Sequence, residues 1–250
     1  MLVIVVVGAY SGYALWDNEQ IYASVDNVQE ELIIYKQKME NDETDITAMF
    51  RELRLINPDV CAWLVMDETM IDYPVVQGET NQTYLYHDVY KNFSISGSIF
   101  LDCRCDPEFN TAYALLHGHH MASRKMFGDL DLYKGEEFFW KNRTGKLYLD
   151  NRVYDLKTFS TMVVPANDDI IFAPYSHMED AEKVLQYAET DSLIKDDEAI
   201  ERLFNEIEQT ESGGKMPQVI ALATCSGEFT DARTVVLAEM ILVDNEGEEQ

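Results

Sequence analysis

The residues of this chain best suited to covalent chemistry are a cysteine and a nearby arginine. Cys225 ends the apolar run that starts at Val219, and Arg233 follows eight residues later, just before a second apolar run. A thiol attacks a carbonyl only as the thiolate, a form that a neighbouring imidazole or guanidinium favours. Attack on an amide also creates an oxyanion, which a fixed cation such as arginine stabilises. If the two runs are neighbouring antiparallel strands, the short loop between them returns Arg233 to the side of Cys225.

A cysteine nucleophile also needs a base, and the segment Leu116–His120 contains three histidines. His119 directly follows Gly118 at the end of an apolar run, where glycine allows close approach of the backbone and lets the histidine protrude into a groove. His117 and His120 compete with it for this role. His117 and His119 could instead bind a metal, although no third ligand accompanies them at a fixed spacing.

Simpler interpretations exist for the thiols and for the arginine. Cys225 could be an inert core residue, and Arg233 could form a surface salt bridge. Cys103-x-Cys105 could be a metal or redox pair, but residues i and i+2 of a strand share a face, so we predict two small apolar side chains on one strand face. The four cysteines are too few and too irregularly spaced for a disulfide framework or a zinc site of the paired CxxC type.

Composition limits the class of protein. At 250 residues the chain suits one sizeable domain, or one domain with an appendage. Its 19 basic against 46 acidic side chains give a net charge of −27, which argues against nucleic acid as a partner because phosphate binding needs clustered lysine and arginine. Much of the acidic charge lies in residues 179–211 and in the tail after Val243, and we interpret it as solvated surface.

The start of the sequence indicates a membrane anchor or signal anchor at residues 1–16. This segment has no charged side chain and is slightly shorter than the ~20 apolar residues of a spanning helix. No basic segment precedes it, so we expect the true start of the protein to lie upstream. No lysine or arginine occurs before Lys36, which by the positive-inside rule places the catalytic domain outside the cytoplasm, as part of a single-pass protein of the cell membrane. A buried core helix or a propeptide is the alternative.

Residues 17–57 carry two helical patterns. Apolar residues recur at helical spacing from Ile21 to Leu32, with Glu and Gln on the other face. A second helix is predicted from Asp45 to Leu55, and it ends before Asn57-Pro58 because a residue that precedes proline disfavours the helical conformation. We interpret the two helices as a spacer or lid between the membrane and the catalytic domain.

From Val60 onward the periodicity changes to short strands, which predict a closed β-barrel or a sandwich over residues 58–243, followed by an acidic tail at 244–250. Asp150-Asn151 is a tight hairpin signal between the fifth and sixth strands. The eight predicted strands are Val60–Met66, Met70–Val76, Gly97–Asp102, Ala112–Gly118, Lys146–Asp150, Arg152–Val163, Gln218–Cys225 and Thr234–Val243.

Helical material is predicted in two insertions, Lys125–Asn142 and Ser176–Gln209. The second insertion holds two helices, of which the first begins with Ser176-x-x-Glu179, a capping-box pattern. The second of these helices is Asp197–Glu208. The residues expected to face the core are Ala181, Val184, Leu185 and Ala188 in the first helix, and Ile200, Leu203, Phe204 and Ile207 in the second.

Several separated motifs together resemble those of the sortases, and their details resemble class B. Leu222-x-Thr224-Cys225 is followed by an arginine on the next predicted strand, and Gly118-His119-His120-Met121 forms a turn at a strand end. The two helices before the barrel and the helical insertion before the cysteine strand also resemble class B. The other matching motifs are Asn57-Pro58-Asp59-x-x-x-Trp63-Leu64, Ile71-Asp72-Tyr73-Pro74-Val75-Val76-Gln77, Tyr84-Leu85 with His87-Asp88, and Gly97-Ser98-Ile99-Phe100-Leu101-Asp102.

Sortases are membrane-anchored cysteine transpeptidases of Gram-positive bacteria with an eight-stranded β-barrel. The resemblance therefore implies a mainly β fold, with an eight-stranded sortase-type barrel, an N-terminal two-helix segment and helical insertions. Carried over by position, it makes Cys225 the nucleophile, His119 the catalytic histidine and Arg233 the third essential residue. It implies no metal and no cofactor.

The resemblance also implies where the substrate binds. Asn81 and Leu85 match class B positions that line the groove for the sorting signal, and Ala223 and Thr224 are further substrate-binding candidates beside the nucleophile. Class B members often have serine where Ala223 stands, so one polar contact with the substrate is lost. The interval between Cys225 and the arginine is also shorter than in many class B members.

By the same resemblance, the substrate is the sorting-signal peptide of a surface protein or pilin. An LPXTG-like or NPXTX-like signal would be cleaved after Thr through a thioacyl-enzyme, and the product would be transferred to an amine. The acceptor would be a peptidoglycan cross-bridge or a pilin lysine, as in pilus assembly. The alternatives from other classes are a catalytically inactive barrel that acts in pilus assembly or surface interaction, and a metal-binding extracellular module.

Overall fold

The computed structural model of the chain describes residues 4–8, 10–13, 16, 28–36, 46–121, 123–210, 215–225 and 231–243, with Cys225 described by its backbone alone. The predicted anchor, the start of the first amphipathic stripe and the acidic tail therefore lie wholly or partly outside the described residues. Within them, no helix is long enough and apolar enough to cross a membrane.

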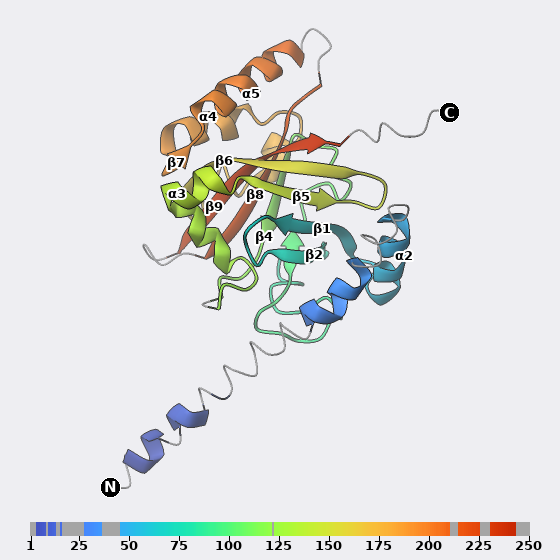
Figure 1. Ribbon diagram of the computed structural model, residues 1–250, viewed down its shortest axis with the longest axis vertical. Coiled ribbons are helices and arrows are strands. Elements are labelled where there is room, and N and C mark those ends of the chain that lie inside the picture. Colours follow the sequence, from blue (N-terminus) through green and yellow to red (C-terminus); the bar gives the residue numbers. More distant parts are fainter. Residues whose placement is uncertain are drawn as a thin grey trace.

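Eight strands close into a barrel (Figure 1). They follow one another in the order β5-β1-β2-β3-β4-β8-β9-β6, and β6 pairs again with β5 to complete the ring. This confirms the predicted eight-stranded barrel, and each predicted strand is present, with shifts at the ends of most. The strands are β1 (Val60–Met66), β2 (Asp72–Val76), β3 (Ile99–Leu101), β4 (Tyr113–His117), β5 (Thr144–Tyr148), β6 (Val153–Pro165), β8 (Gln218–Cys225) and β9 (Ala232–Leu242).

A further strand, β7 (Ile194–Lys195), adds to the free side of β6 and was not predicted, because two residues carry no readable alternation. The predicted hairpin at Asp150-Asn151 is confirmed, since β5 and β6 pair antiparallel from Tyr148 and Val153 onward. Two neighbouring pairs, β2 with β3 and β4 with β8, run parallel. Parallel neighbours need long connections, which explains the long segment 77–98 between β2 and β3.

The helical insertions are present, but one predicted start is wrong. Ser176 does not cap a helix: it lies inside a short 3₁₀ helix, η2 (Pro174–His177), and the following helix starts only at Glu182, without a side-chain cap at Ala181. Pro174 fixes its φ at a helical value and so begins the 3₁₀ turn before Ser176 is reached. The other helical elements are η1 (Gly128–Lys134), α3 (Glu136–Lys141), α4 (Glu182–Asp191) and α5 (Asp197–Thr210).

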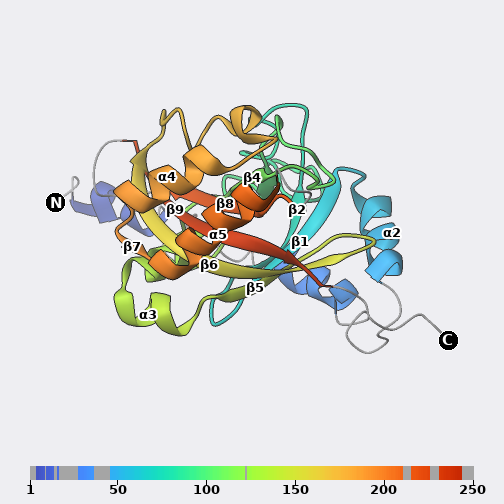
Figure 2. The same ribbon diagram turned by 90° about the horizontal axis from the view of Figure 1, so that it is seen from above.

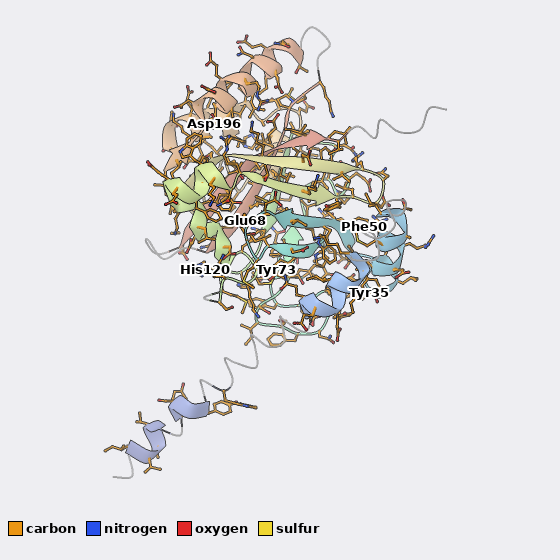
Figure 3. All side chains as sticks on the ribbon, in the orientation of Figure 1. Tyr35, Phe50, Glu68, Tyr73, His120 and Asp196 are labelled. Carbon is orange, nitrogen blue, oxygen red and sulfur yellow. The ribbon has the colours of Figure 1, made fainter. Side chains whose placement is uncertain are left out.

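Helices α4 and α5 lie against the outside of the barrel near β6 and β9 (Figure 2). The predicted apolar faces are confirmed in α4, where Val184, Leu185 and Ala188 are fully buried, and in the first half of α5, where Ile200 and Leu203 are buried. Phe204 and Ile207, by contrast, are only partly buried against the same core. In Figure 3, Asp196 marks this end of the molecule, far from Phe50 on the opposite side.

The N-terminal helices pack on the barrel. A helix over residues 28–36 and α2 (Ile46–Ile56) place Leu32 and Phe50 in a second apolar cluster with Trp63 of β1, and α2 ends before Asn57-Pro58 as predicted. Since Trp63 and its neighbour Leu64 point to opposite faces of β1, this cluster covers the outside of the barrel while Leu64 belongs to the main core. The helices are therefore part of the barrel's packing, a closer association than that of a spacer.

An ion pair also holds the first helix in place. The Lys36 ammonium lies 2.8 Å from a carboxylate oxygen of Asp72 on β2, and the Trp63 indole donates a hydrogen bond of 2.6 Å to the other oxygen of that carboxylate. The same residue thus joins the helix, β1 and β2.

Candidate active site

Cys225 and Arg233 face each other across two neighbouring strands. Cys225 is the last residue of β8, and in the antiparallel ladder with β9 its register partner is Arg233. This is the placement that the short connection between the two runs predicts. The Arg233 side chain is half-buried, and its Nη1 donates to the carbonyl of Ala232 at 2.9 Å, so no carboxylate of the described residues holds it.

His119 reaches the same edge of the barrel from β4. Strands β4 and β8 run parallel with His117 opposite Ala223, and the Gly118 N–H donates to the Ala223 carbonyl at 3.2 Å. His119 stands two residues beyond His117, and Cys225 stands two residues beyond Ala223. Because parallel strands rise in step, His119 and Cys225 lie at the same level at the ends of adjacent strands.

The glycine before His119 is required by packing. A Cβ on Gly118 would lie 2.5 Å from Cδ1 of Ile99 and 2.8 Å from the ring of Phe127. The backbone therefore passes closer to β3 and to the following loop than any other residue permits. The sequence argument for close backbone approach at Gly118 is confirmed at this position.

The imidazole of His119 is held by a backbone carbonyl. Its Nε2 lies 2.8 Å from the oxygen of Leu85, in the connection between β2 and β3, and the ring of Tyr86 is 6.3 Å away between centroids. A carbonyl oxygen only accepts, so Nε2 carries the proton of this hydrogen bond, which leaves Nδ1 as the nitrogen that can gain and lose a proton. Sequence reasoning selected Leu85 as a groove residue and missed this contact with His119.

The two competing histidines have carboxylate partners. Nε2 of His117 lies 3.0 Å from Asp102, and Nε2 of His120 lies 2.9 Å from Asp131. Burial raises the pKa of Asp131, but hydrogen bonds from Lys134 and His120 outweigh it and hold this pKa below its usual value. His117 and His120 are thus both engaged in ion-pair geometry, and His119 alone among the three contacts only uncharged groups in the described part of the chain.

The expected groove residue Asn81 joins the Asp102 cluster. Its Nδ2 donates to Asp102 at 2.7 Å, and its Oδ1 accepts the Cys103 N–H at 2.8 Å. Ala223 and Thr224 are each 2% exposed, and the Thr224 hydroxyl has no hydrogen-bond partner among the described residues. Their contact with a substrate remains a prediction.

The prediction for the cysteine pair is wrong. Strand β3 ends at Leu101, so Cys103 and Cys105 lie on a turn and not on one strand face. The turn forms because the Asp102 carboxylate accepts the N–H of Arg104 at 3.1 Å, which draws the chain away from the ladder. Only Cys105 packs into the core, at 7% exposure.

The other described thiols are poor nucleophiles. Burial raises the pKa of both Cys61 and Cys105 to about 12, so both stay protonated at neutral pH. As for metals, no group of three or more His, Cys, Asp or Glu side chains that could hold an ion occurs in the described parts of the chain. The arrangement suits cysteine-based acyl transfer, with the backbone of Cys225, Arg233 and His119 converging on one edge of the barrel.

Known proteins share this fold and sequence pattern, although no family model matches the chain. The chain is 25% identical over 248 residues to sortase B of Staphylococcus aureus, covering 97% of this chain and 94% of the relative. The solved structure of Spy0129, a Streptococcus pyogenes class B sortase involved in pilus biogenesis, is 32% identical, with a TM-score of 0.65 and coverage of 76% of this chain and 97% of that one. Clostridium perfringens sortase B is 33% identical, with a TM-score of 0.65 and coverage of 78% and 99%.

A closed barrel with a cysteine, an arginine and a histidine at the ends of adjacent strands defines a cysteine transpeptidase of the sortase type. Identity above 30% over nearly the whole length of two solved class B structures settles the family: the chain belongs to the class B sortases.

Proposed function

We propose that the protein is a membrane-anchored, extracellular sortase that cleaves a sorting signal after Thr and transfers the acyl group to an amine. The observation that carries the proposal is the register at one edge of the barrel. Cys225 stands opposite Arg233 on β9 and level with His119 beyond β4, so the nucleophile, the oxyanion donor and the acid meet at one place.

In the first step the thiolate of Cys225 attacks the carbonyl carbon that follows the Thr side chain, forming a C–S bond. The Arg233 guanidinium stabilises the oxyanion, and His119 gives its Nδ1 proton to the leaving amine as the C–N bond breaks. In the second step an acceptor amine attacks the thioester and forms a new amide. The C–S bond breaks, the thiolate returns, and the proton of the acceptor amine goes back to His119.

Solved relatives support a peptide donor and an amine acceptor. Structures of Staphylococcus aureus sortase B exist in complex with a substrate and with triglycine, and Spy0129 is involved in pilus biogenesis. For this chain we propose an LPXTG-like or NPXTX-like donor signal. The acceptor is either the amine of a peptidoglycan cross-bridge or the lysine of a pilin subunit.

Mass spectrometry tests the chemistry directly. The chain without residues 1–16 is incubated with both kinds of signal peptide, and a thioacyl adduct on Cys225 is expected. Addition of triglycine or of a lysine-bearing pilin peptide should discharge the adduct and identify the acceptor. An adduct that persists in Cys225→Ala, or the absence of any adduct with every peptide, contradicts the proposal.

Membrane attachment rests on residues 1–16, which carry no charged side chain and are followed by the acidic residues Asp17 and Glu19. In cells, the full chain should sediment with membranes and be degraded by external protease. Deletion of residues 1–16 should release it to the soluble fraction. Sedimentation that is unchanged by the deletion would contradict the anchor.

A further inference from the structure

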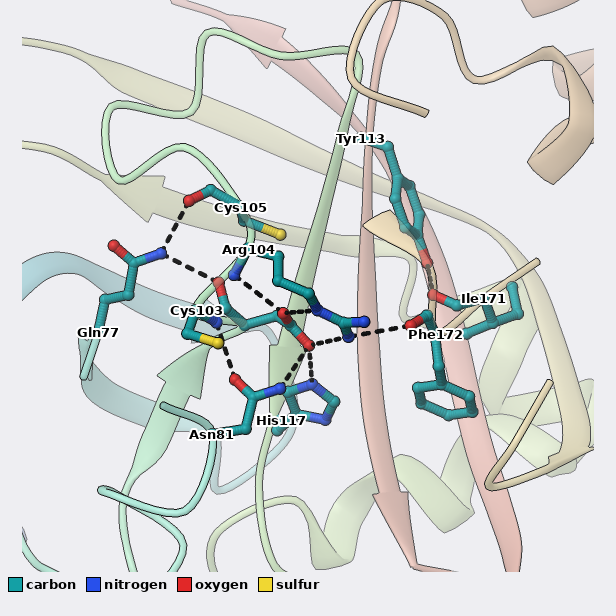
Figure 4. A network of polar contacts seen from close by, with 10 residues as sticks. Gln77, Asn81, Cys103, Arg104, Cys105, Tyr113, His117, Ile171 and Phe172 are labelled. Atoms are coloured by element: carbon teal, nitrogen blue, oxygen red, sulfur yellow. Dashed lines mark hydrogen bonds and ion pairs between the residues drawn. The ribbon is translucent and has the colours of Figure 1, made fainter. Parts of the chain in front are cut away.

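We propose that Asp102 is a positioning residue that ties two segments beside the groove to the barrel and so sets the affinity for the sorting-signal peptide. The two segments are the connection 77–98 between β2 and β3, and residues 166–177 between β6 and η2. This inference rests on the proposed function, because it assigns the groove to that peptide. Figure 4 shows the Asp102 carboxylate at the centre of the contacts that link them.

Every contact of the Asp102 carboxylate is with a donor. The side chain is fully buried directly after β3, where Oδ1 accepts from Nε and the backbone N–H of Arg104 at 2.7 and 3.1 Å. Oδ2 accepts from Arg104 Nη2 at 2.7 Å, from Asn81 Nδ2 at 2.7 Å and from His117 Nε2 at 3.0 Å. Burial alone raises the pKa of Asp102, but the hydrogen bonds of Arg104 and His117 outweigh it and leave this pKa well below its usual range.

The first segment is held through its amide side chains. Asn81 donates to Asp102 Oδ2, and Gln77 Nε2 donates to the carbonyls of Asp102 and Cys105 at 3.0 and 2.9 Å. Four residues after Asn81, the Leu85 carbonyl accepts from His119 at 2.8 Å. Asp102 thus fixes the start of the same connection that contacts the catalytic histidine further along.

The second segment is held through Arg104 and His117. Arg104 Nη2 also donates to the Phe172 carbonyl at 2.9 Å, and the Phe172 ring stacks on His117 with 6.2 Å between centroids. Phe100 stacks on the other side of His117 at 5.1 Å. The Tyr113 hydroxyl adds a 3.0 Å hydrogen bond to the carbonyl of Ile171. Both donors that reach this segment from around Asp102 depend on its carboxylate for their orientation.

Packing alone does not require this ionised group. A buried charge costs solvation free energy, and an apolar side chain of similar volume would fill the space at least as well. Its distinguishing property is geometric, since one carboxylate orients donors from three separate parts of the chain. The ends of β4, β8 and β9 lie outside its contacts, so its loss should weaken peptide binding more than the chemical step.

The test compares Asp102→Asn with Asp106→Asn. The first variant keeps the shape but places an NH₂ group against donors. The second makes the same change in the same turn, where Asp106 accepts only the N–H groups of Glu108 and Asn110. With the signal peptide that forms the adduct, Asp102→Asn should raise KM about tenfold, as loss of a hydrogen bond to a charged group predicts, with kcat within about threefold. The control should change neither constant by more than about twofold.

Two further measurements separate positioning from general stability and from catalysis. In a Cys225→Ala background, the dissociation constant of the peptide should rise by the same factor as KM, since no chemistry follows binding. Hydrogen exchange should quicken in residues 77–98 and 166–177 of Asp102→Asn, while β8 and β9 keep the protection they have in Asp106→Asn. If Asp102→Asn does not fold, Arg104→Lys takes its place, because lysine keeps the charge but loses the fork that reaches Phe172.

The outcomes are distinct. Equal KM values and equal exchange in the two Asp→Asn variants overturn the inference, as does a fall in kcat at unchanged KM. If the unaltered chain forms no adduct with any peptide, the proposed function fails, and the exchange experiment still decides whether Asp102 positions the two segments.

Discussion

His117 and His119 stand on either side of one glycine, yet their surroundings differ in kind. His117 meets a fully buried carboxylate and lies between the rings of Phe100 and Phe172. His119 meets a backbone carbonyl, and its only aromatic neighbour among the described residues is Tyr86, at 6.3 Å. A carboxylate favours the imidazolium and an aromatic stack restrains the ring, whereas a carbonyl orients the ring without fixing its charge.

The difference shows that a histidine–carboxylate pair is not by itself the mark of a catalytic base. In this chain the pair belongs to the network that holds the groove segments, and the histidine at the end of the cysteine's neighbouring strand has no acidic partner in the described residues. A histidine that must both give and take a proton during a reaction cycle is better served by a neutral partner.

Removal of His119 should have the largest effect on activity. His119→Ala loses the proton donor for the leaving amine, so kcat/KM for adduct formation should fall by about 10²–10⁴-fold. Steady-state turnover of a fluorogenic signal peptide measures the loss. If His117→Ala shows the greater loss and His119→Ala stays active, the assignment of the two histidines is reversed.

The glycine that separates the two histidines should tolerate no side chain. In Gly118→Ala the new Cβ would lie 2.5 Å from Ile99, so repacking should cost about 1–3 kcal/mol of unfolding free energy and also lower turnover by displacing His119. Urea unfolding measures the stability. Gly135→Ala is the matched control, because its nearest neighbouring atom is 3.4 Å away, and a similar cost in both variants would contradict the packing argument.

The environment of His117 predicts a dependence of stability on acid. The pKa of Asp102 is depressed in the folded chain by Arg104 and His117, against the raising effect of burial, while in the unfolded chain it is about 3.9. Its stabilisation is therefore complete above about pH 4–5 and is lost as pH falls toward the folded pKa. The difference in unfolding free energy between the unaltered chain and Asp102→Asn should be constant at about pH 5–7 and narrow below about pH 4. A difference that does not depend on pH would show that Asp102 is not ionised in the folded state.

Replacement of His117 should reduce stability more than turnover. His117→Phe keeps a ring between Phe100 and Phe172 but removes one donor from Asp102, which should cost about 1–2 kcal/mol of unfolding free energy and change kcat less than about tenfold. His120→Phe should cost less, since its partner Asp131 is 37% exposed and water replaces the lost donor. Equal costs in the two variants would argue against the buried network.

Chelation should have no effect. The described residues contain no group of three or more candidate metal ligands, and His117 and His119 are directed to different partners. The rate of adduct formation in excess EDTA should equal the untreated rate. A loss that added metal reverses would instead support the two histidines as ligands.

The sequence predicted most of the barrel because its signals are local. Strands Val60–Met66 and Gln218–Cys225 match at both ends, and α2 ends where Asn57-Pro58 requires. Errors arose where a nearby residue overrode the pattern. Pro174 began a 3₁₀ turn in front of the apparent capping box, and the side chain of Asp102 ended β3 before the cysteine pair.

The sequence by itself determined the class of enzyme and its candidate residues, because the strand that carries Cys225, the following arginine and the Gly-His pair are each short motifs. Only the tertiary structure decided which partner each histidine has. Leu85 and Asp102 lie 34 and 15 residues from the histidines they contact, and the parallel pairing of β4 with β8 brings together strands about a hundred residues apart. Such contacts depend on the closure of the barrel, which no local pattern of residue types encodes.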